Sequence, residues 1–318
     1  MTSISSSRVF SIVVATVLAG CSGGTTLPSS QGESGVLSAS PQVHARVVSG
    51  FDLSQTKDTL VYIPDNTDVL VFDAKTQQQV ATITDGISGP TGIFVQANRD
   101  VFVANSDGGN ATEYGVGTLN LVKTFESPGT HPWDVAKCPD GIVYVATMDG
   151  QVAYYVGGAK PAGFISVSGA SNYLAVACGP KSNVYVGYYA NGYERVEKFG
   201  PQGHGSEALP MQGGYRSPLI VDKNHDVVFG NVDDETIEFW ADGGTKPYKT
   251  ITTFNQPGWV IQYLKFAPGE KQLWAQISEG HGTYAYEIDV KSGNILITLP
   301  YVDSGGPGLA VSPADTFK

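Results

Sequence analysis

Residues that build metal and redox centres are scarce in this sequence. It has only five His and three Cys in 318 residues, and no His stands at a metal-ligand spacing such as His-x-Glu. We therefore expect no cofactor and no metal site. The one alternative is a divalent cation bound by the run Asp233-Asp234-Glu235, although three consecutive acids in a loop are usually only solvated.

Positive charge is also scarce. The chain has 19 Lys and Arg against 30 Asp and Glu, which gives a formal net charge of −11. An acidic surface repels the phosphates of nucleic acids and of anionic lipid head groups. The composition therefore disfavours nucleic-acid binding, and attachment to a membrane would need another means.

No hydrophobic run near the N-terminus is long enough to span a bilayer. The apolar stretch Val9–Val17 is short and ends in Leu18-Ala19-Gly20-Cys21, which resembles the lipobox of bacterial lipoproteins. The resemblance implies a signal peptide over residues 1–20 and a lipid-bearing Cys21 that anchors the chain in the membrane. Because Ser22 follows, it implies the outer membrane, facing the periplasm or the cell surface. The alternatives are an ordinary signal peptide cut nearby and a free N-terminal segment.

Residues 21–46 are predicted to form a flexible tether. Gly, Ser, Thr, Pro and Gln dominate this stretch, and runs such as Ser22-Gly23-Gly24-Thr25-Thr26 contain nothing that could pack in a core. A flexible coil of about 20 residues has a root-mean-square reach of about 25 Å. The folded domain is therefore expected over residues 47–318.

One phrase recurs six times in that domain: a short apolar strand, a turn, and a second apolar strand that ends in small polar residues. The clearest copy runs from Thr91-Gly92-Ile93-Phe94-Val95-Gln96 to Val101-Phe102-Val103-Ala104-Asn105-Ser106. The spacing is 40 to 45 residues when the equivalent positions are taken as Gly92, Asp134, Leu174, Pro218, Tyr263 and Gly308. Short runs rich in Val, Ile, Tyr and Phe at this spacing predict four strands per blade of a β-propeller.

The two ends of the domain supply one blade between them. Only six residues follow the last inner strand, Gly308–Ser312, whereas residues 59–84 contain three strands without an inner one. We therefore predict an all-β fold, a six-bladed β-propeller whose C-terminal strand pairs with the N-terminal three strands. This pairing closes the ring and removes free sheet edges.

The phrases resemble two kinds of propeller repeat. Leu60-Val61-Tyr62-Ile63-Pro64-Asp65-Asn66 with Val69–Ala74 resembles a YVTN-type unit, and Pro90-Thr91-Gly92-Ile93 with Val101–Ser106 resembles an NHL-type repeat. The likeness covers roughly residues 47–317. It implies the fold and leaves the function open, since such propellers include scaffolds, ligand-binding modules, lyases and lactonases.

Cys138 and Cys178 are both fifth in their phrases, so they are expected at equivalent places on neighbouring inner strands. Two interpretations stay open. Outside the cytoplasm a disulfide is chemically allowed, and it would close a loop of about 40 residues. Equivalent inner-strand positions, however, lie near the upper Cα–Cα limit of about 7 Å, which favours two buried thiols that pack as small hydrophobes.

A ligand is expected on one face of the ring, called here the loop face, which combines the loops before the inner strands with the loops between second and third strands. Loops on a rigid scaffold often carry function, and aromatic rings beside Asp and Asn suit a saccharide or an extended peptide. The residues predicted to bind are His131, Trp133, Tyr173, Tyr188, Tyr215, Arg216, Trp259, Asp233 and Asp234. The plainer interpretation is that Asp and Asn make turns and the aromatic rings pack between blades.

Two functions fit these features. The first is an envelope-anchored, non-catalytic propeller that binds a protein or glycan on its loop face. The second is a small-molecule lyase or lactonase with its site at the central channel, with or without a divalent metal. No catalytic constellation is recognisable in the sequence, and the Glu-Gly-Pro opening of gluconolactonase-type propellers is missing. These observations favour the first function.

Overall fold

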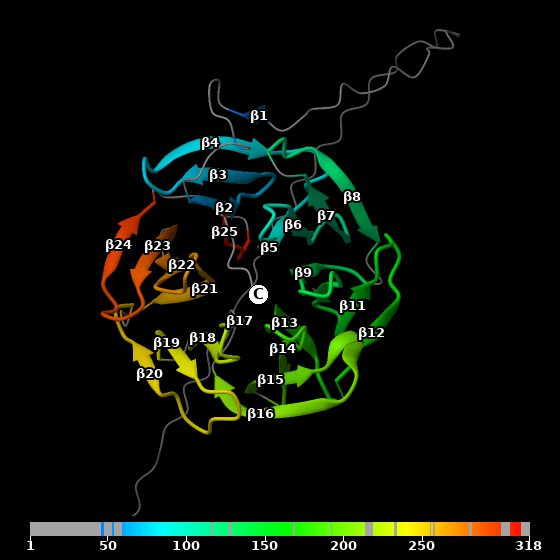
Figure 1. Ribbon diagram of the computed structural model, residues 1–318, viewed down its shortest axis with the longest axis vertical. Coiled ribbons are helices and arrows are strands. Elements are labelled where there is room, and N and C mark those ends of the chain that lie inside the picture. Colours follow the sequence, from blue (N-terminus) through cyan, green and yellow to red (C-terminus); the bar gives the residue numbers. More distant parts are fainter. Residues whose placement is uncertain are drawn as a thin grey trace, which may run out of the picture. The chain divides into compact units, whose positions relative to one another are not determined.

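The chain folds into a ring of six antiparallel sheets, the blades of a β-propeller (Figure 1). The computed structural model describes residues 46–47, 53 and 59–312, except 116, 127–128, 168, 192, 214–218, 232–233, 255, 257, 280–281 and 300–305. The predicted signal peptide, Cys21 and almost all of the predicted tether lie outside the described residues, as do Tyr215, Arg216 and Asp233.

Successive strands of each blade run from the channel outward to the rim (Figure 1). Blades 2 to 4 contain β5 (Pro90–Val95), β6 (Val101–Asn105), β7 (Asn110–Tyr114) and β8 (Leu121–Glu126); β9 (Pro132–Lys137), β10 (Val143–Thr147), β11 (Gln151–Tyr155) and β12 (Gly163–Ile165); and β13 (Asn172–Cys178), β14 (Val184–Ala190), β15 (Tyr193–Phe199) and β16 (Ser206–Gly213). Blades 5 and 6 contain β17 (Leu219–Val221), β18 (Val227–Asn231), β19 (Thr236–Trp240) and β20 (Lys249–Ile251); and β21 (Trp259–Phe266), β22 (Gln272–Glu279), β23 (Thr283–Asp289) and β24 (Ile295–Thr298).

Helix is nearly absent from the described part of the chain. One 3-10 turn, η1 (Pro201–Gly203), joins β15 to β16. Within the described residues, no helix has the length and hydrophobicity needed to cross a membrane.

Blade 1 closes the ring from both ends of the domain. Its inner strand β25 (Ala310–Ser312) pairs with β2 (Leu60–Pro64), and β3 (Val69–Asp73) and β4 (Gln78–Ile83) follow outward. A short fifth strand, β1 (Arg46–Val47), pairs with the outer edge of β4. The predicted all-β, six-bladed propeller and its closure by the C-terminal strand are confirmed.

Alternating side chains of the strands fill the interfaces between blades. In β9, Val135 packs toward blade 2 with Phe102, whereas Ala136 packs toward blade 4 with Val186. Both faces of a blade are therefore buried, which explains why the second strands β6 and β10 are buried throughout and apolar except for their last residues, Asn105 and Thr147.

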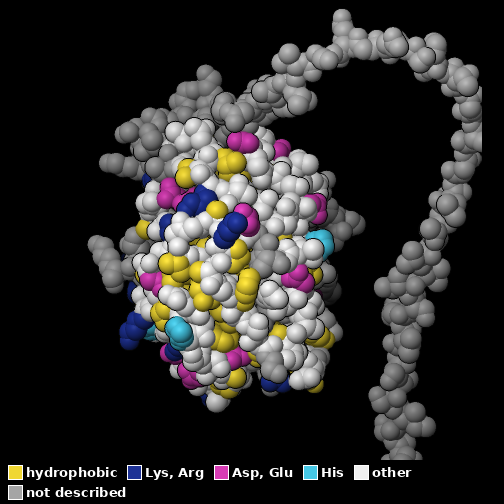
Figure 2. Space-filling model, turned by 90° about the vertical axis from the view of Figure 1, so that its right-hand side faces the viewer, with side chains coloured by type: hydrophobic (Ala, Val, Ile, Leu, Met, Phe, Trp, Pro, Cys, Tyr) yellow, Lys and Arg dark blue, Asp and Glu magenta, His cyan; other side chains and the backbone are white. Residues whose placement is uncertain are grey.

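The outer strands face solvent at the rim of the ring. On the side seen in Figure 2, hydrophobic side chains lie among acidic and basic ones. Around the whole rim, exposed hydrophobic side chains include Val122 on β8, Phe164 on β12 and Leu296 on β24. The edges of β12 and β20 are only three residues long, which limits pairing with other chains.

A disulfide joins Cys138 to Cys178, with the Cα atoms 5.1 Å apart. The prediction that the two residues are equivalent is wrong by one position. The N–H of Cys138 donates to the carbonyl of Ile142, whereas the matching bond in blade 4 runs from Gly179 to Asn183. A shift of one residue turns a side chain to the other face of its strand. Cys178 therefore faces blade 3 where Cys138 faces blade 4, and the expected pair of free thiols is not found.

Two glycines let the inner strands approach closely. A Cβ on Gly308 would overlap the carbonyl oxygen of Thr91, and a Cβ on Gly92 would lie 2.5 Å from the Cα of Asp134. No real side chain tolerates such contacts, so blades 2 and 1 require Gly at 92 and 308, although other blades have larger residues at the equivalent position. The hydroxyl of Thr91 donates to the carbonyl of Pro132 at 3.1 Å and adds a direct link between blades 2 and 3.

Candidate functional site

Trp259, predicted to bind a ligand on the loop face, is half-buried at the start of β21. Its indole lies nearly parallel to the ring of Tyr286, at 11° and with centroids 6.4 Å apart, and its centroid is 6.1 Å from that of Phe254. Some of its surface remains exposed, as expected. The stacking nevertheless gives Trp259 a packing role in blade 6.

Tyr173 and Tyr188 are brought together as partners across strands β13 and β14. Tyr188 is 5% exposed, and its hydroxyl donates to Glu197 Oε2 at 3.3 Å. Its ring belongs to the core cluster that contains side chains of blades 3 and 4. Little of Tyr188 is thus available to a ligand, and the binding role of this pair stays a prediction.

The other described residues predicted on the loop face are His131, Trp133 and Asp234. His131 is exposed with φ of 59°, and Trp133 beside it is half-buried. Asp234 accepts a hydrogen bond from Asn231 Nδ2 at 3.0 Å, and its N–H donates to Asn231 Oδ1 at 3.2 Å. Asp234 therefore shapes the turn between β18 and β19, as the plainer interpretation expects.

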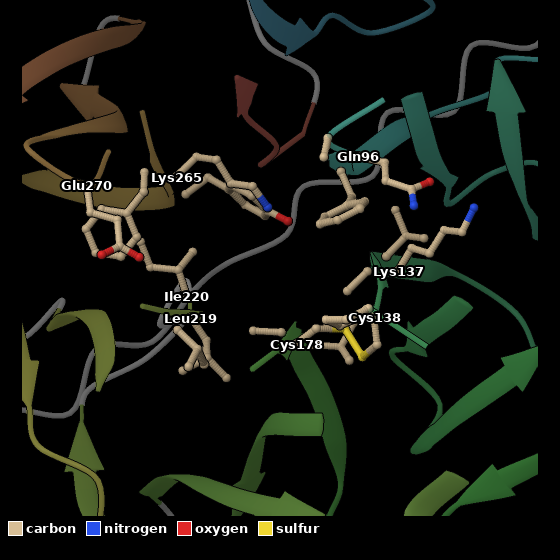
Figure 3. A pocket seen from close by; sticks show the side chains of 18 residues that line it. Gln96, Lys137, Cys138, Cys178, Leu219, Ile220, Lys265 and Glu270 are labelled. Carbon is tan, nitrogen blue, oxygen red and sulfur yellow. A yellow bond between two sulfur atoms is a disulfide. The ribbon is translucent and has the colours of Figure 1, made fainter. Parts of the chain in front are cut away.

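A cavity of about 260 Å³ lies in the central channel near the opposite face, called here the turn face, where turns join first strands to second strands. Five inner strands and the turns after them line it (Figure 3). None of the described residues predicted on the loop face lines this cavity. It is therefore a candidate site that the loop-face hypothesis did not include.

Turn hydrogen bonds identify which inner-strand residues occupy the same height in the channel. The N–H groups that close the first turn of their blades belong to Gln96, Cys138, Gly179, Asp222 and Ala267. Two residues earlier lies the lysine level, which consists of Phe94, Ala136, Ala177, Ile220 and Lys265; all five line the cavity. Four residues earlier lies the aspartate level, which includes Gly92, Asp134, Ala175 and Tyr263.

A hydrogen bond crosses the channel at the aspartate level. Tyr263 in blade 6 donates its hydroxyl proton to Oδ1 of Asp134 in blade 3, the opposite blade of the ring. The carboxylate is 2% exposed and also accepts from the N–H groups of Val135 at 2.8 Å and Val176 at 2.9 Å. Burial raises the pKa of Asp134 to about 6, against the hydrogen bonds and the positive charge of Lys265, which lower it.

Lys265 extends from β21 toward the centre of the channel (Figure 3). It follows Tyr263 by two residues, so both side chains leave the same face of the strand. Its Nζ lies 4.6 Å from the centroid of the Phe94 ring, and it forms no ion pair with any described residue. Burial lowers the pKa of Lys265 to about 8, although the negative charge of Asp134 raises it.

The other charged residues at the cavity have partners of their own. Glu270 accepts from the Lys223 N–H at 2.7 Å and pairs with the Lys223 ammonium at 3.2 Å. Lys137 points away from the centre in Figure 3, with its ammonium 4.0 Å from Glu113 and 5.0 Å from the Phe102 ring centroid. Among the described lining residues, Lys265 thus supplies the charge that faces the cavity without an ion pair.

Most polar groups near the cavity are engaged by other groups of the protein. Oδ1 of Asp134 accepts hydrogen bonds from Tyr263 and Val135, and Oδ2 accepts one from Val176, so most of the acceptor positions of this carboxylate are engaged. Within the described residues, no group of three His, Cys, Asp or Glu side chains is placed to hold a metal ion. The cavity instead offers an apolar wall with one ammonium.

The sequence contains a signal for this site that the loop-face prediction did not use. Most equivalent positions of the inner strands are apolar or Gly, so Asp134 and Lys265 stand out. Asp134 and Tyr263 also occupy the same repeat position three blades apart, and such positions face each other across a ring of six. In blade 4 the repeat alignment was off by one residue, because β13 is irregular between Tyr173 and Ala175. Ala175, not Leu174, is the equivalent residue.

Comparisons with solved structures support the fold. A protein of unknown function from Bacteroides caccae superposes with a TM-score of 0.59 at 11% identity, over 80% of this chain and 99% of that one. A chain from a nidogen/laminin complex gives 0.64 at 10% identity, over 81% and 100%. Virginiamycin B lyase from Staphylococcus aureus gives 0.55 at 9% identity, over 80% and 88%.

No protein-family model and no curated protein matches the chain. At identities near 10%, the three structures share the propeller fold with this chain, and fold alone does not assign a function. The chain is thus a six-bladed β-propeller whose structural neighbours include an enzyme and a component of a protein complex.

Proposed function

We propose that the chain is a non-catalytic binding module of the bacterial envelope whose ligand occupies the central cavity. The likeness of Leu18-Ala19-Gly20-Cys21 to a lipobox supports a lipid anchor on Cys21, and the Gly- and Ser-rich residues 21–46 support a tether. Labelled palmitate should be incorporated by the wild-type chain and not by Cys21→Ser. Equal incorporation by both forms would contradict the anchor.

One observation carries the proposed site: an ammonium that has no ion-pair partner among the described residues faces a cavity of about 260 Å³ lined mostly by apolar side chains. Pockets for drug-sized ligands measure about 300–1,000 Å³ and combine apolar walls with a few polar groups that orient the ligand. The cavity in this propeller has that composition at a slightly smaller size. A small molecule therefore fits it better than a peptide or an oligosaccharide does.

Binding in the cavity can be tested by filling it. Ala177 lines the cavity and is 8% exposed, so Ala177→Phe should occupy the space that a ligand needs. Isothermal titration of both forms against a panel of small charged and neutral compounds should detect binders of the wild type that the variant has lost. Compounds that bind both folded forms equally do not use the cavity.

A protein or glycan partner on the loop face is a second candidate. The exposed His131 and the half-buried Trp133 in and after the loop before β9 offer surface for it, and the neighbour from a nidogen/laminin complex is a propeller within a protein assembly. A glycan array and cross-linking in intact cells should then report binding that His131→Ala weakens and Ala177→Phe leaves intact.

A lyase or lactonase reaction in the channel is the catalytic alternative. Its support is the pKa of about 8 at Lys265, since an amine that titrates near neutrality can act as base or nucleophile, together with the likeness to virginiamycin B lyase. Turnover of a lactone or cyclic-ester panel that disappears in Lys265→Met would favour this alternative over pure binding.

A further inference from the structure

The lysine level presents one polar group within a ring of apolar ones. Phe94, Ala136, Ala177 and Ile220 supply aromatic and aliphatic surface at the same height as Lys265. A ligand at this level therefore meets hydrocarbon on most sides and a single positive charge on one side.

Lys265 is half-buried, and its ammonium forms no ion pair within the described part of the chain. Its contacts are the face of Phe94, 4.6 Å from the ring centroid, and the electrostatic field of Asp134. The carboxylate of Asp134 is occupied by its hydrogen bonds with Tyr263, Val135 and Val176. Removing an ammonium from water is costly unless an anion pairs with it, so an anionic ligand gains more here than a neutral one.

The other charged groups around the cavity do not cancel this preference. Glu270 is paired with Lys223, and Lys137 lies near Glu113. The net charge of −11 repels anions at long range, but that repulsion is screened beyond about 8 Å at physiological ionic strength. The negative charge of Asp134 acts on Lys265, but Asp134 does not line the cavity, so a ligand in the cavity is closer to the ammonium than to the carboxylate side chain.

The size of the cavity limits the ligand to a compact molecule. An engineered protein cavity of about 150 Å³ lined by aliphatic and aromatic side chains binds benzene. At about 260 Å³, the cavity in this propeller has room for a body of that size together with one charged group.

We infer that the cavity binds a small monocarboxylate with a compact apolar body. The carboxylate pairs with the ammonium of Lys265, and the body lies against Phe94, Ala177 and Ile220. This inference rests on the proposed function, because it identifies the ligand class of the same cavity. A carboxylate suits the site because the ammonium of Lys265 can donate one charge-assisted hydrogen bond to it.

Matched pairs of compounds test the inference on the full-length chain. Benzoate and benzyl alcohol share a ring and differ in charge, as hexanoate and hexanol share an alkyl chain. Isothermal titration at pH 7 should give at least about tenfold tighter binding of each carboxylate than of its alcohol, in line with the strength of charge-assisted hydrogen bonds. Lys265→Met should abolish the preference and leave alcohol binding intact, while the control Lys137→Met should keep it.

The outcomes separate the inference from the proposed function. Alcohols that bind the wild type as tightly as the carboxylates, with binding blocked by Ala177→Phe, would overturn the carboxylate class and leave a cavity that binds small molecules. If neither pair binds the folded chain, both ideas fail. Lys265→Gln replaces Lys265→Met should the latter not fold, and a retained carboxylate preference in Lys265→Gln would also overturn the inference.

Discussion

The aspartate level and the lysine level lie two residues apart on the same inner strands, and each contains one charged residue, the buried Asp134 and the half-buried Lys265. Asp134 has three hydrogen bonds, one of which reaches the opposite blade. The ammonium of Lys265 lies over the Phe94 ring and feels the negative charge of Asp134. Its side chain lines the cavity. The contrast suggests that a buried charge with hydrogen-bond partners contributes structure, whereas a half-buried charge beside a cavity, without an ion pair in the described part of the chain, indicates a site.

The largest effect is expected where the aspartate level is packed most tightly. Gly92→Val places a Cβ about where the Asp134 carboxylate lies and 2.5 Å from its Cα. Because backbone cannot yield as a side-chain end does, the variant should lose more than about 4 kcal/mol of stability or fail to fold. Ala177→Val at the lysine level adds two methyl groups beside the cavity and should change stability by about 1 kcal/mol or less. Equal urea midpoints for both variants would remove the difference in packing between the levels.

The disulfide gives the next largest effect, since Cys138–Cys178 joins blades 3 and 4 below the lysine level. Closing a loop with a sequence separation of 40 stabilises a fold by about 4 kcal/mol on the chain-entropy model. The Cys138→Ala/Cys178→Ala variant should therefore melt at a clearly lower temperature. The bond from Val176 to Asp134 still links the two blades, so the circular dichroism spectrum at low temperature should stay unchanged. A melting temperature equal to that of the oxidised wild type would show that the crosslink adds no stability.

Trp259→Ala tests whether aromatic residues near the loop face act in packing. The stack with Tyr286 and Phe254 predicts a loss of about 3 kcal/mol, near the lower end of the range for large aromatic truncations because Trp259 is only half-buried. Carboxylate binding in the cavity should not change. An unaltered melting temperature, combined with lost ligand binding, would return Trp259 to the functional site.

The smallest expected effects are pH dependences of opposite sign. The pKa of Asp134 is raised from 3.8 to about 6, so the folded state binds its proton more tightly, and stability should rise as pH falls from about 6 to about 4. The pKa of Lys265 is lowered from 10.5 to about 8, so the unfolded state binds its proton more tightly, and stability should rise as pH increases from about 8 to about 10.5. Each contribution is on the order of 1–3 kcal/mol.

Lys265→Met separates the two contributions. The variant should be at least as stable as the wild type at pH 7, lack the alkaline rise and keep the acid rise. Melting temperatures measured from pH 4 to pH 10 on both forms give the comparison. If the alkaline rise persists in the variant, another group causes it, and the account of Lys265 as a half-buried cation without an ion pair in the described part of the chain is wrong.

The fold could be read from the sequence because it depends on a pattern repeated six times. The spacing, the alternating strands, and the single inner strand at one end with three strands at the other led to the closure that β25 and β2 make. The position of Cys178 could not be read reliably, because one irregularity in β13 shifts every later side chain to the other face.

The site was harder to predict than the fold, for a physical reason. The type of a residue shows which interactions it can make, but the sequence does not show which neighbours already satisfy it. Trp259 stacks on Tyr286, and Asp234 accepts a hydrogen bond from Asn231. Asp134 and Lys265, in contrast, are common residue types, but they are unusual at repeat positions that are apolar or Gly in most other blades. A charged side chain on an inner strand can reach solvent only through the channel. The register of the repeat is therefore enough to predict that such a residue lines the channel.

The hydrogen bond from Tyr263 to Asp134 also changes how motion can spread through the molecule. In a ring where each blade touches only its two neighbours, a disturbance travels step by step along the circumference, as in other repeat proteins. The hydrogen bond links blades 3 and 6 directly across the channel. The ring should therefore deform less along the axis through these two blades than along other axes. Amide exchange should therefore be correlated between two blades that have half a circle of protein between them.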